Sequence, residues 1–589
     1  MNEASFDDTR AVLSGLSPRS AFAPSLPASS GGWSSGALVA AFSALVLILG
    51  LSSTAPEGAT AHELSGILRD GPNHATTGTL WGWIAVAFES LPFGPTSVWR
   101  ISLASAIATA LAGGLLAVWL RQRDIGRRAA VSAGMLFAFS LPVWQTAVVP
   151  SATPIAALLA LLALVLFEEG VATRKSAPRL LGWAVVGVTV TQGPIALGSI
   201  AAVLAATALP RGAWERPRIS SFLATGIAFG LALLVLGGLA PLAAAFSPHP
   251  GGWEPSRPAE ALTQAVWQSG PIGCVALLGL LLLWWRHPGD AGALTLLGVM
   301  PLVSALFWGP CGRGSSAAAA FVAAVPLTYA ALAALAGAAI DAVLQRYAAT
   351  PNPRAHILTA LTAAIPIGVL ALGAPLANRS EWRYGEEWAR SVLTSLPDDA
   401  VLFTAPDPRG GLLEWLQLIG SVRPDVVIAD PDGSVDRRRS PILDITPRPK
   451  SPAAAISAVR AMTARPIFSI DPLPTAEGRW TPWALVWRYA PSDEAIAGES
   501  EEAWAHVQFS HLPKTPEKAR AWINEEIDAP LRDSTARMIA ADYFQALARR
   551  EGKLSSIGPW ATVLEHLGGM RGVVERTLEE SETHDPASD

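Results

Sequence analysis

Cysteine and charged residues are both scarce in this chain of 589 residues, and each shortage excludes a class of protein. The two cysteines, Cys274 and Cys311, are too few for a disulfide scaffold or a cysteine-based metal cluster. Charged residues make up 15% of the chain, whereas soluble domains carry roughly a quarter. The net charge of -5 provides no basic footprint for a polyanion, so no nucleic-acid partner is expected.

Apolar residues and tryptophan are abundant instead. Apolar residues make up 51% of the chain, and the mean hydropathy is +0.35. The chain has 22 tryptophans but only 5 tyrosines, and tryptophan collects at the interfaces of membranes. This composition predicts a polytopic α-helical membrane protein whose main partner is membrane lipid.

Apolar runs long enough to span a bilayer recur along the first two thirds of the chain. Gly193-Pro194 interrupts one of them, so that stretch is either a tight hairpin of two helices or one kinked helix. We expect about eleven transmembrane helices, at 36–54, 97–120, 129–148, 151–168, 179–194, 196–210, 219–241, 264–285, 291–309, 317–341 and 355–376.

Basic residues predict the orientation of these spans. With eleven spans, all the strongly basic stretches fall on one side, which the positive-inside rule assigns to the cytoplasm. These stretches are 121–128, 174–179, 211–218, Arg286 and 346–354. The N-terminus is then cytoplasmic, whereas loop 55–96 and everything after 376 are extracytoplasmic. The expected location is the plasma (inner) membrane.

Composition divides the chain into five regions. Residues 1–34 are predicted to be a disordered cytoplasmic tail, and 35–376 the membrane domain. Residues 377–500 are expected to form an extracytoplasmic α/β domain and 501–570 a helical hairpin, followed by an acidic disordered tail at 571–589.

Short apolar segments within 377–500 alternate between strand and helix patterns, which is typical of a parallel sheet. We expect strands at 400–405, 425–429, 466–470 and 483–488, and helices at 410–420 and 452–464. No glycine-rich phosphate loop follows any of these strands, and no histidines stand at metal-ligand spacing. No cofactor and no metal are therefore expected.

The first external loop, 55–96, is long and combines polar groups with an apolar helix. Leu80, Ile84 and Phe88 repeat at helical spacing, which predicts a helix lying in the membrane interface that ends at 91–94. Before this helix stand the carboxylates and histidines His62, Glu63, Asp70 and His74. Such groups beside an interfacial helix indicate a candidate site at the boundary of water and lipid.

Several stretches resemble one family of membrane proteins. They include Leu91-Pro92-Phe93-Gly94, the run 98–105, the run 139–148 with Trp144-Gln145, and 396–426 with Arg423-Pro424-Asp425-Val426. Their order and spacing are similar to those of domain-of-unknown-function family 2723. That family includes bacterial multi-spanning proteins and the eukaryotic transmembrane-protein-260 type of protein O-mannosyltransferase.

The resemblance implies a GT-C glycosyltransferase fold. In such enzymes, membrane helices hold a polyprenyl-phosphate sugar donor, and a carboxylate in the first external loop acts as general base on the acceptor hydroxyl. The acceptor would be an extracytoplasmic protein or glycan. A cation near the interface would neutralise the leaving phosphate. The residues expected to bind substrate are Arg69, His74, Trp81 and Arg100.

The chain departs from the family pattern in the first loop itself. Thr60 stands where the family has an Asp, whereas Glu63 retains a later Glu. Three interpretations stay open. Glu63 is the base, assisted by His62 or His74; Asp70 substitutes for the lost Asp; or the protein is not a catalyst.

Two other functions compete with the glycosyltransferase. One is a catalytically inactive relative that acts as a membrane-anchored lipid-binding or assembly protein, as the missing Asp suggests. The other is a transporter or flippase. The scarcity of ionisable residues in the middle of the spans argues against the transporter, because coupled carriers need buried charges along their pathway.

Overall fold

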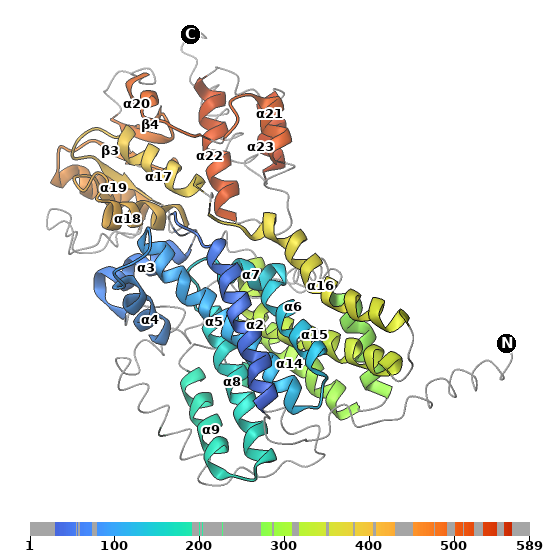
Figure 1. Cartoon of the computed structure of the whole chain (residues 1–589). Helices are drawn as coiled ribbons and strands as arrows, with labels where there is room; N and C mark the ends of the chain where they lie inside the picture. The colour runs from blue at the N-terminus through green and yellow to red at the C-terminus, as the bar shows by residue number, and fades with distance from the viewer. Residues whose placement is uncertain are drawn as a thin grey trace. The chain divides into compact units, whose positions relative to one another are not determined.

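A computed structural model describes the greater part of the chain. The described ranges are 30–54, 59–72, 79–190, 272–285, 288–308, 317–348, 353–380, 383–404, 408–429, 451–475, 477–491, 501–510, 512–523, 534–550 and 559–567, with a few isolated positions besides. Figure 1 shows the helices and strands along the chain.

The chain divides into two compact units, each made of two segments that are separate in the sequence. The membrane unit comprises Met1–Ser53 and Asp70–Ser380, and the α/β unit comprises Thr54–Arg69 and Glu381–Asp589. A short segment of the expected first loop therefore belongs to the α/β unit, which the sequence pattern did not predict.

The described part of the membrane unit is helical. Its helices are α2 (Ser30–Leu49), α4 (Thr79–Glu89), α5 (Ser97–Gln122), α6 (Arg127–Phe139), α7 (Leu141–Ala147), α8 (Thr153–Ala172), α9 (Ser176–Val190), α14 (Pro288–Trp308), α15 (Ala317–Ala348), α16 (Pro353–Ala377) and the helix Ile272–Trp285. Every expected apolar run overlaps one of these helices except 196–210 and 219–241, which lie almost entirely outside the described residues.

Four helices are long and apolar enough to cross a membrane, so the chain is a helical membrane protein. They are Gly31–Leu49, Ser97–Gln122, Thr153–Ala172 and Pro326–Arg346. The expected count of about eleven is not confirmed, because within the described residues only these four qualify, or five if α6 and α7 form one span.

The expected span 129–148 is broken into α6 and α7, whose axes differ by 62°. Ser140 between them has an extended ψ of 132°, and Pro142 follows in the first turn of α7. Proline has no N–H to donate to the preceding turn, which is why the chain bends here.

Glycine permits a close helix contact in the membrane unit, where α2 crosses α5. A Cβ on Gly36 would lie 2.8 Å from the carbonyl oxygen of Gly114, and a Cβ on Gly114 would lie 2.7 Å from that of Gly36. Such distances are shorter than side chains permit, so the two backbones approach only because both residues are glycine.

Buried charges gather where α5, α8 and α14 meet. Arg123, just after α5, donates to the Glu168 carboxylate of α8 at 2.5 Å, and its Nη1 lies 3.4 Å from the Asp290 carboxylate of α14. Nearby, the Gly126 N–H donates to Asp341 of α15 at 2.9 Å. The basic stretch that begins at 121 therefore lies at the same end of this unit as Glu168 and Asp290.

The segments that enter and leave the α/β unit meet at the opposite end. Gly32, at the start of α2, lies beside Arg121, so the C-terminal end of α2 points away from the charged cluster. There the Arg379 N–H donates to the Gly50 carbonyl, and the Ser53 hydroxyl to the Ser380 carbonyl. The first loop and the chain after α16 therefore leave the membrane unit at the same end.

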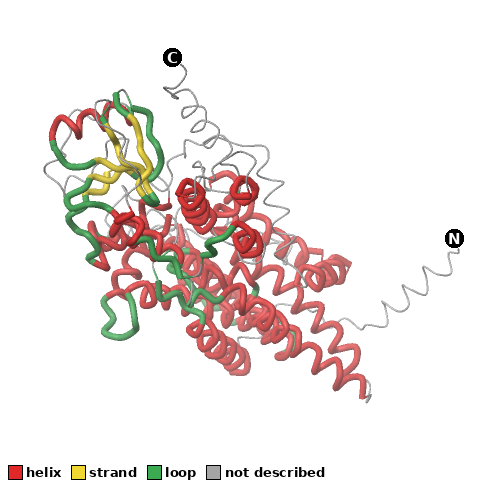
Figure 2. The backbone as a smooth tube through the Cα atoms, turned by 90° about the horizontal axis from the view of Figure 1, so that it is seen from above, coloured by secondary structure: helices red, strands yellow, loops and turns green. Residues whose placement is uncertain are grey.

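One five-stranded sheet organises the α/β unit, in the order β2-β1-β3-β5-β4. Figure 2 shows its strands in yellow. Its strands are β1 (Val401–Phe403), β2 (Val427–Ala429), β3 (Ile467–Ser469), β4 (Arg479–Trp483) and β5 (Val486–Ala490). β1 pairs in parallel with β2 and β3, whereas β5 pairs antiparallel with β3 and β4.

The expectation of a purely parallel sheet was wrong at its last strand. The range 483–488 contains the last residue of β4, a two-residue hairpin turn at 484–485 and the first half of β5, and Ala484 in that turn has a φ of +48°. The apolar residues on both sides of the turn read as one continuous strand in the sequence, because neither glycine nor asparagine marks the reversal.

Helices surround this sheet and extend beyond it. They are α3 (Ala59–Asp70), α17 (Tyr384–Ser395), α18 (Pro408–Gly420), α19 (Pro452–Met462), α20 (Glu501–Ala505), α21 (Pro516–Trp522), α22 (Ser534–Arg550) and α23 (Pro559–His566). Aromatic rings pack α21, α22 and α23 together, since Phe544 lies 6.2 Å from the Trp522 ring and 5.5 Å from the Trp560 ring.

Candidate functional site

The polar part of the first loop forms helix α3, where the sequence pattern predicted an irregular loop. Ala61, Leu64 and Ile67 are fully buried, and their spacing of three residues places them along one side of the helix. Gly58, Thr60, Ser65 and Gly66 weaken the helical signal in the sequence, so only the apolar spacing could have indicated this helix.

Glu63, the candidate base, is buried within the second turn of α3, and 8% of the residue is exposed. It does not face bulk water, unlike an ordinary acidic residue on the surface of a loop. Thr60, which replaces the family's Asp, lies three residues earlier and is half-buried. The retained carboxylate therefore lies one helical turn from the position of the lost one.

His62 is exposed and lies against α18. Its Nδ1 is 3.3 Å from Oε2 of Glu414, and the exposed fractions of the two side chains are 71% and 22%. Oε2 of Glu414 is buried and accepts no hydrogen bond among the described residues. When the imidazole is protonated, this contact becomes an ion pair that compensates the carboxylate.

The remaining candidates from the end of the loop are placed unequally. Arg69 and Asp70 are the last residues of α3, and both are half-buried. His74 lies outside the described residues. The structure therefore brings Glu63, His62, Arg69 and Asp70 onto one short helix.

Arg100 and Trp81 lie in the membrane unit, where other groups occupy them. Arg100 donates from Nε to the backbone carbonyl of Glu89 at 2.8 Å and from Nη2 to its carboxylate at 3.1 Å. The Trp81 ring is fully buried, whereas Trp83 is the exposed indole of α4. In this structure neither Arg100 nor Trp81 presents an open surface to a sugar or a lipid phosphate.

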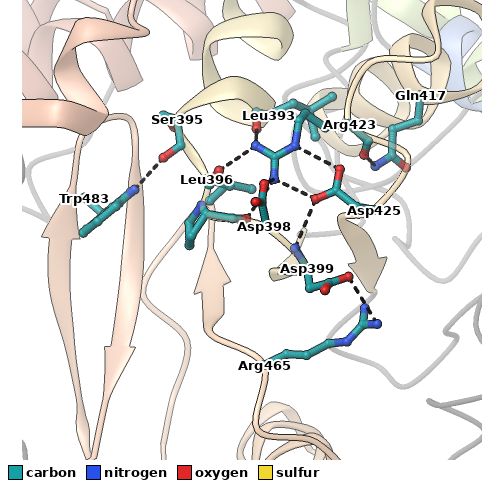
Figure 3. A network of polar contacts seen from close by, with 11 residues as sticks. Leu393, Ser395, Leu396, Asp398, Asp399, Gln417, Arg423, Asp425, Arg465 and Trp483 are labelled. Atoms are coloured by element: carbon teal, nitrogen blue, oxygen red, sulfur yellow. Dashed lines mark hydrogen bonds and ion pairs between the residues drawn. The ribbon is translucent and has the colours of Figure 1, made fainter.

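The Arg423-Pro424-Asp425-Val426 stretch ties together the loops around β2 (Figure 3). Arg423 donates to the carboxylate of Asp425 at 2.7 and 2.9 Å, and to the backbone carbonyls of Leu396 and Pro397 at 2.6 and 2.9 Å. This guanidinium holds the pKa of Asp425 well below its usual range and has its own pKa raised by the same contact. These hydrogen bonds give Arg423 and Asp425 a structural role in the α/β unit.

A second arginine centre was missed by sequence reasoning. Arg409, in the first turn of α18, donates from Nη1 to both carboxylate oxygens of Asp542 at 2.8 and 3.0 Å, and its Nη2 contacts Asp471. The three residues come from positions 409, 471 and 542, so no local pattern could have joined them. They connect α18 with α22 and with the segment that follows β3.

Among the described residues, no group of three or more histidine, cysteine, aspartate or glutamate side chains is arranged to hold a metal ion. Helix α3 carries the buried carboxylate of Glu63, the imidazole of His62, the guanidinium of Arg69 and the half-buried carboxylate of Asp70.

No protein-family model and no curated protein sequence matches this chain, so the resemblance to family 2723 rests on the quoted residues alone. Two solved structures show a distant likeness. ArnT from Cupriavidus metallidurans, bound to undecaprenyl phosphate, is 15% identical with a TM-score of 0.48; the match covers 75% of this chain and 93% of ArnT.

The second is the arabinosyltransferase EmbB from Mycobacterium smegmatis, at 15% identity and a TM-score of 0.33. This match covers 59% of the present chain and 38% of EmbB. Because both TM-scores lie below 0.5, neither likeness decides the fold or the activity of this protein.

Proposed function

We propose that this protein is a membrane glycosyltransferase of the GT-C class. It transfers a sugar from a polyprenyl-phosphate donor to a protein or glycan acceptor on the extracytoplasmic side of the plasma (inner) membrane. Glu63 is the proposed general base, and Arg69 the proposed cation beside the leaving phosphate. The proposed donor and acceptor follow from the resemblance in sequence.

The burial of Glu63 carries the proposal. It is the carboxylate that the first loop retains from the family pattern, and 8% of it is exposed. Removing a carboxylate from water costs free energy, so a buried one has to be compensated by hydrogen bonds or by a nearby opposite charge. Burial and specific neighbours also tune carboxylates for proton transfer in active sites.

The orientation of the protein is part of the proposal. The Arg121 and Arg123 end of the membrane unit carries the basic stretch 121–128, and cytoplasmic loops are enriched in such residues. Gly50 and Arg379 meet at the other end, where the chain passes into the α/β unit. We therefore place α3 and the rest of the α/β unit outside the cytoplasm, where a lipid-linked donor is exposed to acceptors.

In the proposed reaction, the acceptor hydroxyl attacks the anomeric carbon of the donor sugar. The bond from that carbon to the phosphate oxygen breaks, and polyprenyl phosphate leaves. The Glu63 carboxylate takes the hydroxyl proton as the new bond forms, because a neutral hydroxyl is a weak nucleophile. Arg69 stabilises the negative charge of the departing phosphate.

The test is donor turnover by the purified full-length protein in lipid. A panel of labelled polyprenyl-phosphate sugars is offered to wild type, to Glu63→Gln and to the control Glu386→Gln, whose carboxylate pairs with Arg390 on the outer face of α17. We expect sugar release from wild type and the control, and a loss of about 100-fold or more in Glu63→Gln. Equal release from all three would refute the role of Glu63.

An inactive, lipid-binding relative is the alternative, and the contact of His62 with Glu414 favours it. This contact holds α3 against α18 within the α/β unit, as a helix with a purely structural role would also require. The same panel distinguishes the two, because an inactive relative would retain labelled polyprenyl phosphate without releasing sugar from any donor.

A further inference from the structure

Helix α18 approaches α3 too closely for any side chain to stand between them at one point. A Cβ added to Gly411 would lie 2.6 Å from the backbone nitrogen of His62, 3.0 Å from its Cα and 2.9 Å from its Cβ. Contacts below 3.0 Å to backbone atoms require the backbone to move. The glycine therefore permits a direct contact at the residue that precedes Glu63.

The same turn of α18 makes a second contact with the same residue. Glu414 follows Gly411 by three positions, so both lie on one face of α18. The carboxylate of Glu414 is 3.3 Å from the imidazole of His62. One helical turn thus supports α3 both sterically and electrostatically at His62.

This turn of α18 is itself anchored at its N-terminal end. Arg409, two residues before Gly411, donates to the buried carboxylate of Asp542 on α22 and also contacts the partly exposed Asp471 after β3. On the neighbouring helix, a Cβ on Gly385 of α17 would lie 3.3 Å from the Leu412 side chain. Sheet, α17 and α22 together therefore hold α18 in place.

We infer that packing against α18 holds α3, the candidate catalytic helix, in place. Gly411 and Glu414 are then positioning residues for Glu63. The effect on catalysis rests on the proposed function, whereas the packing of α3 against α18 does not. A displaced α3 moves the carboxylate away from the acceptor hydroxyl, and a displacement of about 1 Å can lower turnover about 100-fold.

The test compares Gly411→Ala with Gly420→Ala in the full-length protein in lipid. Gly420 ends the same helix, and a Cβ there would meet only side-chain atoms at 3.3 Å or more. Hydrogen–deuterium exchange of the peptide 59–70 reports how stably α3 is held, and this measurement does not depend on enzymatic activity. We expect exchange to rise about tenfold in Gly411→Ala and to stay at the wild-type rate in Gly420→Ala.

Donor turnover is measured on the same samples. We expect kcat to fall about 100-fold in Gly411→Ala while KM changes little, because the acceptor geometry and not the donor affinity is disturbed. Unchanged exchange in Gly411→Ala would overturn the inference, whatever happens to turnover. No turnover in wild type, with raised exchange in Gly411→Ala, would refute the proposed function but would support the packing of α3 against α18.

The contact between His62 and Glu414 is tested by exchanging the two residues. Glu414→Gln is expected to raise exchange of 59–70 severalfold, and the double variant His62→Glu with Glu414→His to restore it, because the pair is rebuilt in reverse. If the double variant exchanges as fast as the single variant Glu414→Gln, the pairing does not hold α3 in place. Glu414 is then not a positioning residue.

Discussion

Arg123 in the membrane unit and Arg423 in the α/β unit each contact two carboxylates, but at different depths. Arg123 is 2% exposed, and its partners Glu168 and Asp290 are 3% and 8% exposed. Arg423 is 20% exposed, and its partner Asp398 is fully exposed. Water can replace the partners of Arg423 after a mutation, whereas it cannot reach those of Arg123. The same chemical pairing should therefore stabilise these two regions unequally.

The largest effect is expected from Arg123→Met. It leaves the carboxylates of Glu168 and Asp290 buried without their cation, which costs about 3–5 kcal/mol. The measurement is the apparent melting temperature of the protein in lipid. Arg127→Met, at an exposed position of the next helix, is the control and should change stability by less than about 0.5 kcal/mol.

Replacing all three members of the cluster sharpens the comparison. Arg123→Met combined with Glu168→Leu and Asp290→Leu removes the unpaired charges together with the cation. We expect this triple variant to be more stable than Arg123→Met alone, because apolar residues of similar volume tolerate burial. A triple variant less stable than the single one would show that the cluster has more than a local role.

Arg409→Met should come next, at about 2–4 kcal/mol. Asp542 is 6% exposed and loses two hydrogen bonds, but Asp471 is 38% exposed and can be hydrated. Hydrogen–deuterium exchange of α22 should rise, because that helix carries Asp542. A rise confined to the membrane unit would contradict this assignment.

Arg423→Met is expected to cost less, about 1–2 kcal/mol, because its partners are the exposed Asp398, Asp425 and the carbonyl groups of a surface loop. Its effect should depend on pH. The pKa of Asp425 lies below its ordinary value of 3.8 in the folded protein, so the stabilisation is fully present above that pH and is lost as the pH falls further.

The pH dependence is measured by comparing the apparent melting temperatures of wild type and Arg423→Met in a series of buffers. The difference between them should be constant from about pH 7 to pH 5 and should shrink as the pH is lowered below about 4. A difference that grows in acid would mean that Asp425 is not the partner that matters.

The smallest effect is expected from Arg390→Ala, which breaks a pair with Glu386 one turn away on α17. The exposed fractions are 52% and 32%, so the loss should be about 0.3–0.5 kcal/mol and should vanish in high salt. A loss as large as that of Arg423→Met would show that burial is not what separates these arginines.

The local patterns of the sequence predicted much of the fold. The helix predicted from the spacing of Leu80, Ile84 and Phe88 is α4. The strands β1, β2 and β3 lie within the ranges of three expected strands. Apolar periodicity is a local property, and so it can be read without knowing what the segment packs against. The basic stretch at 121–128 likewise indicated one end of the membrane unit.

The candidate site was predictable only in part. Glu63 and His62 were singled out from the first loop, but the helix that carries them was not, because glycine, serine and threonine dilute its pattern. Trp81 and Arg100 were chosen by residue type. Their burial and their contact with Glu89 depend on how α4 packs, which residue type does not reveal.

The sequence by itself determined that this is a helical membrane protein, because apolar length and composition are counted along the chain. It also determined that strands and helices alternate after 400. Only the tertiary structure decided that α3 joins the α/β unit and that Gly411 and Glu414 meet it at His62. These contacts join positions about 350 residues apart, and such pairings arise from packing in space rather than from any local period of the chain.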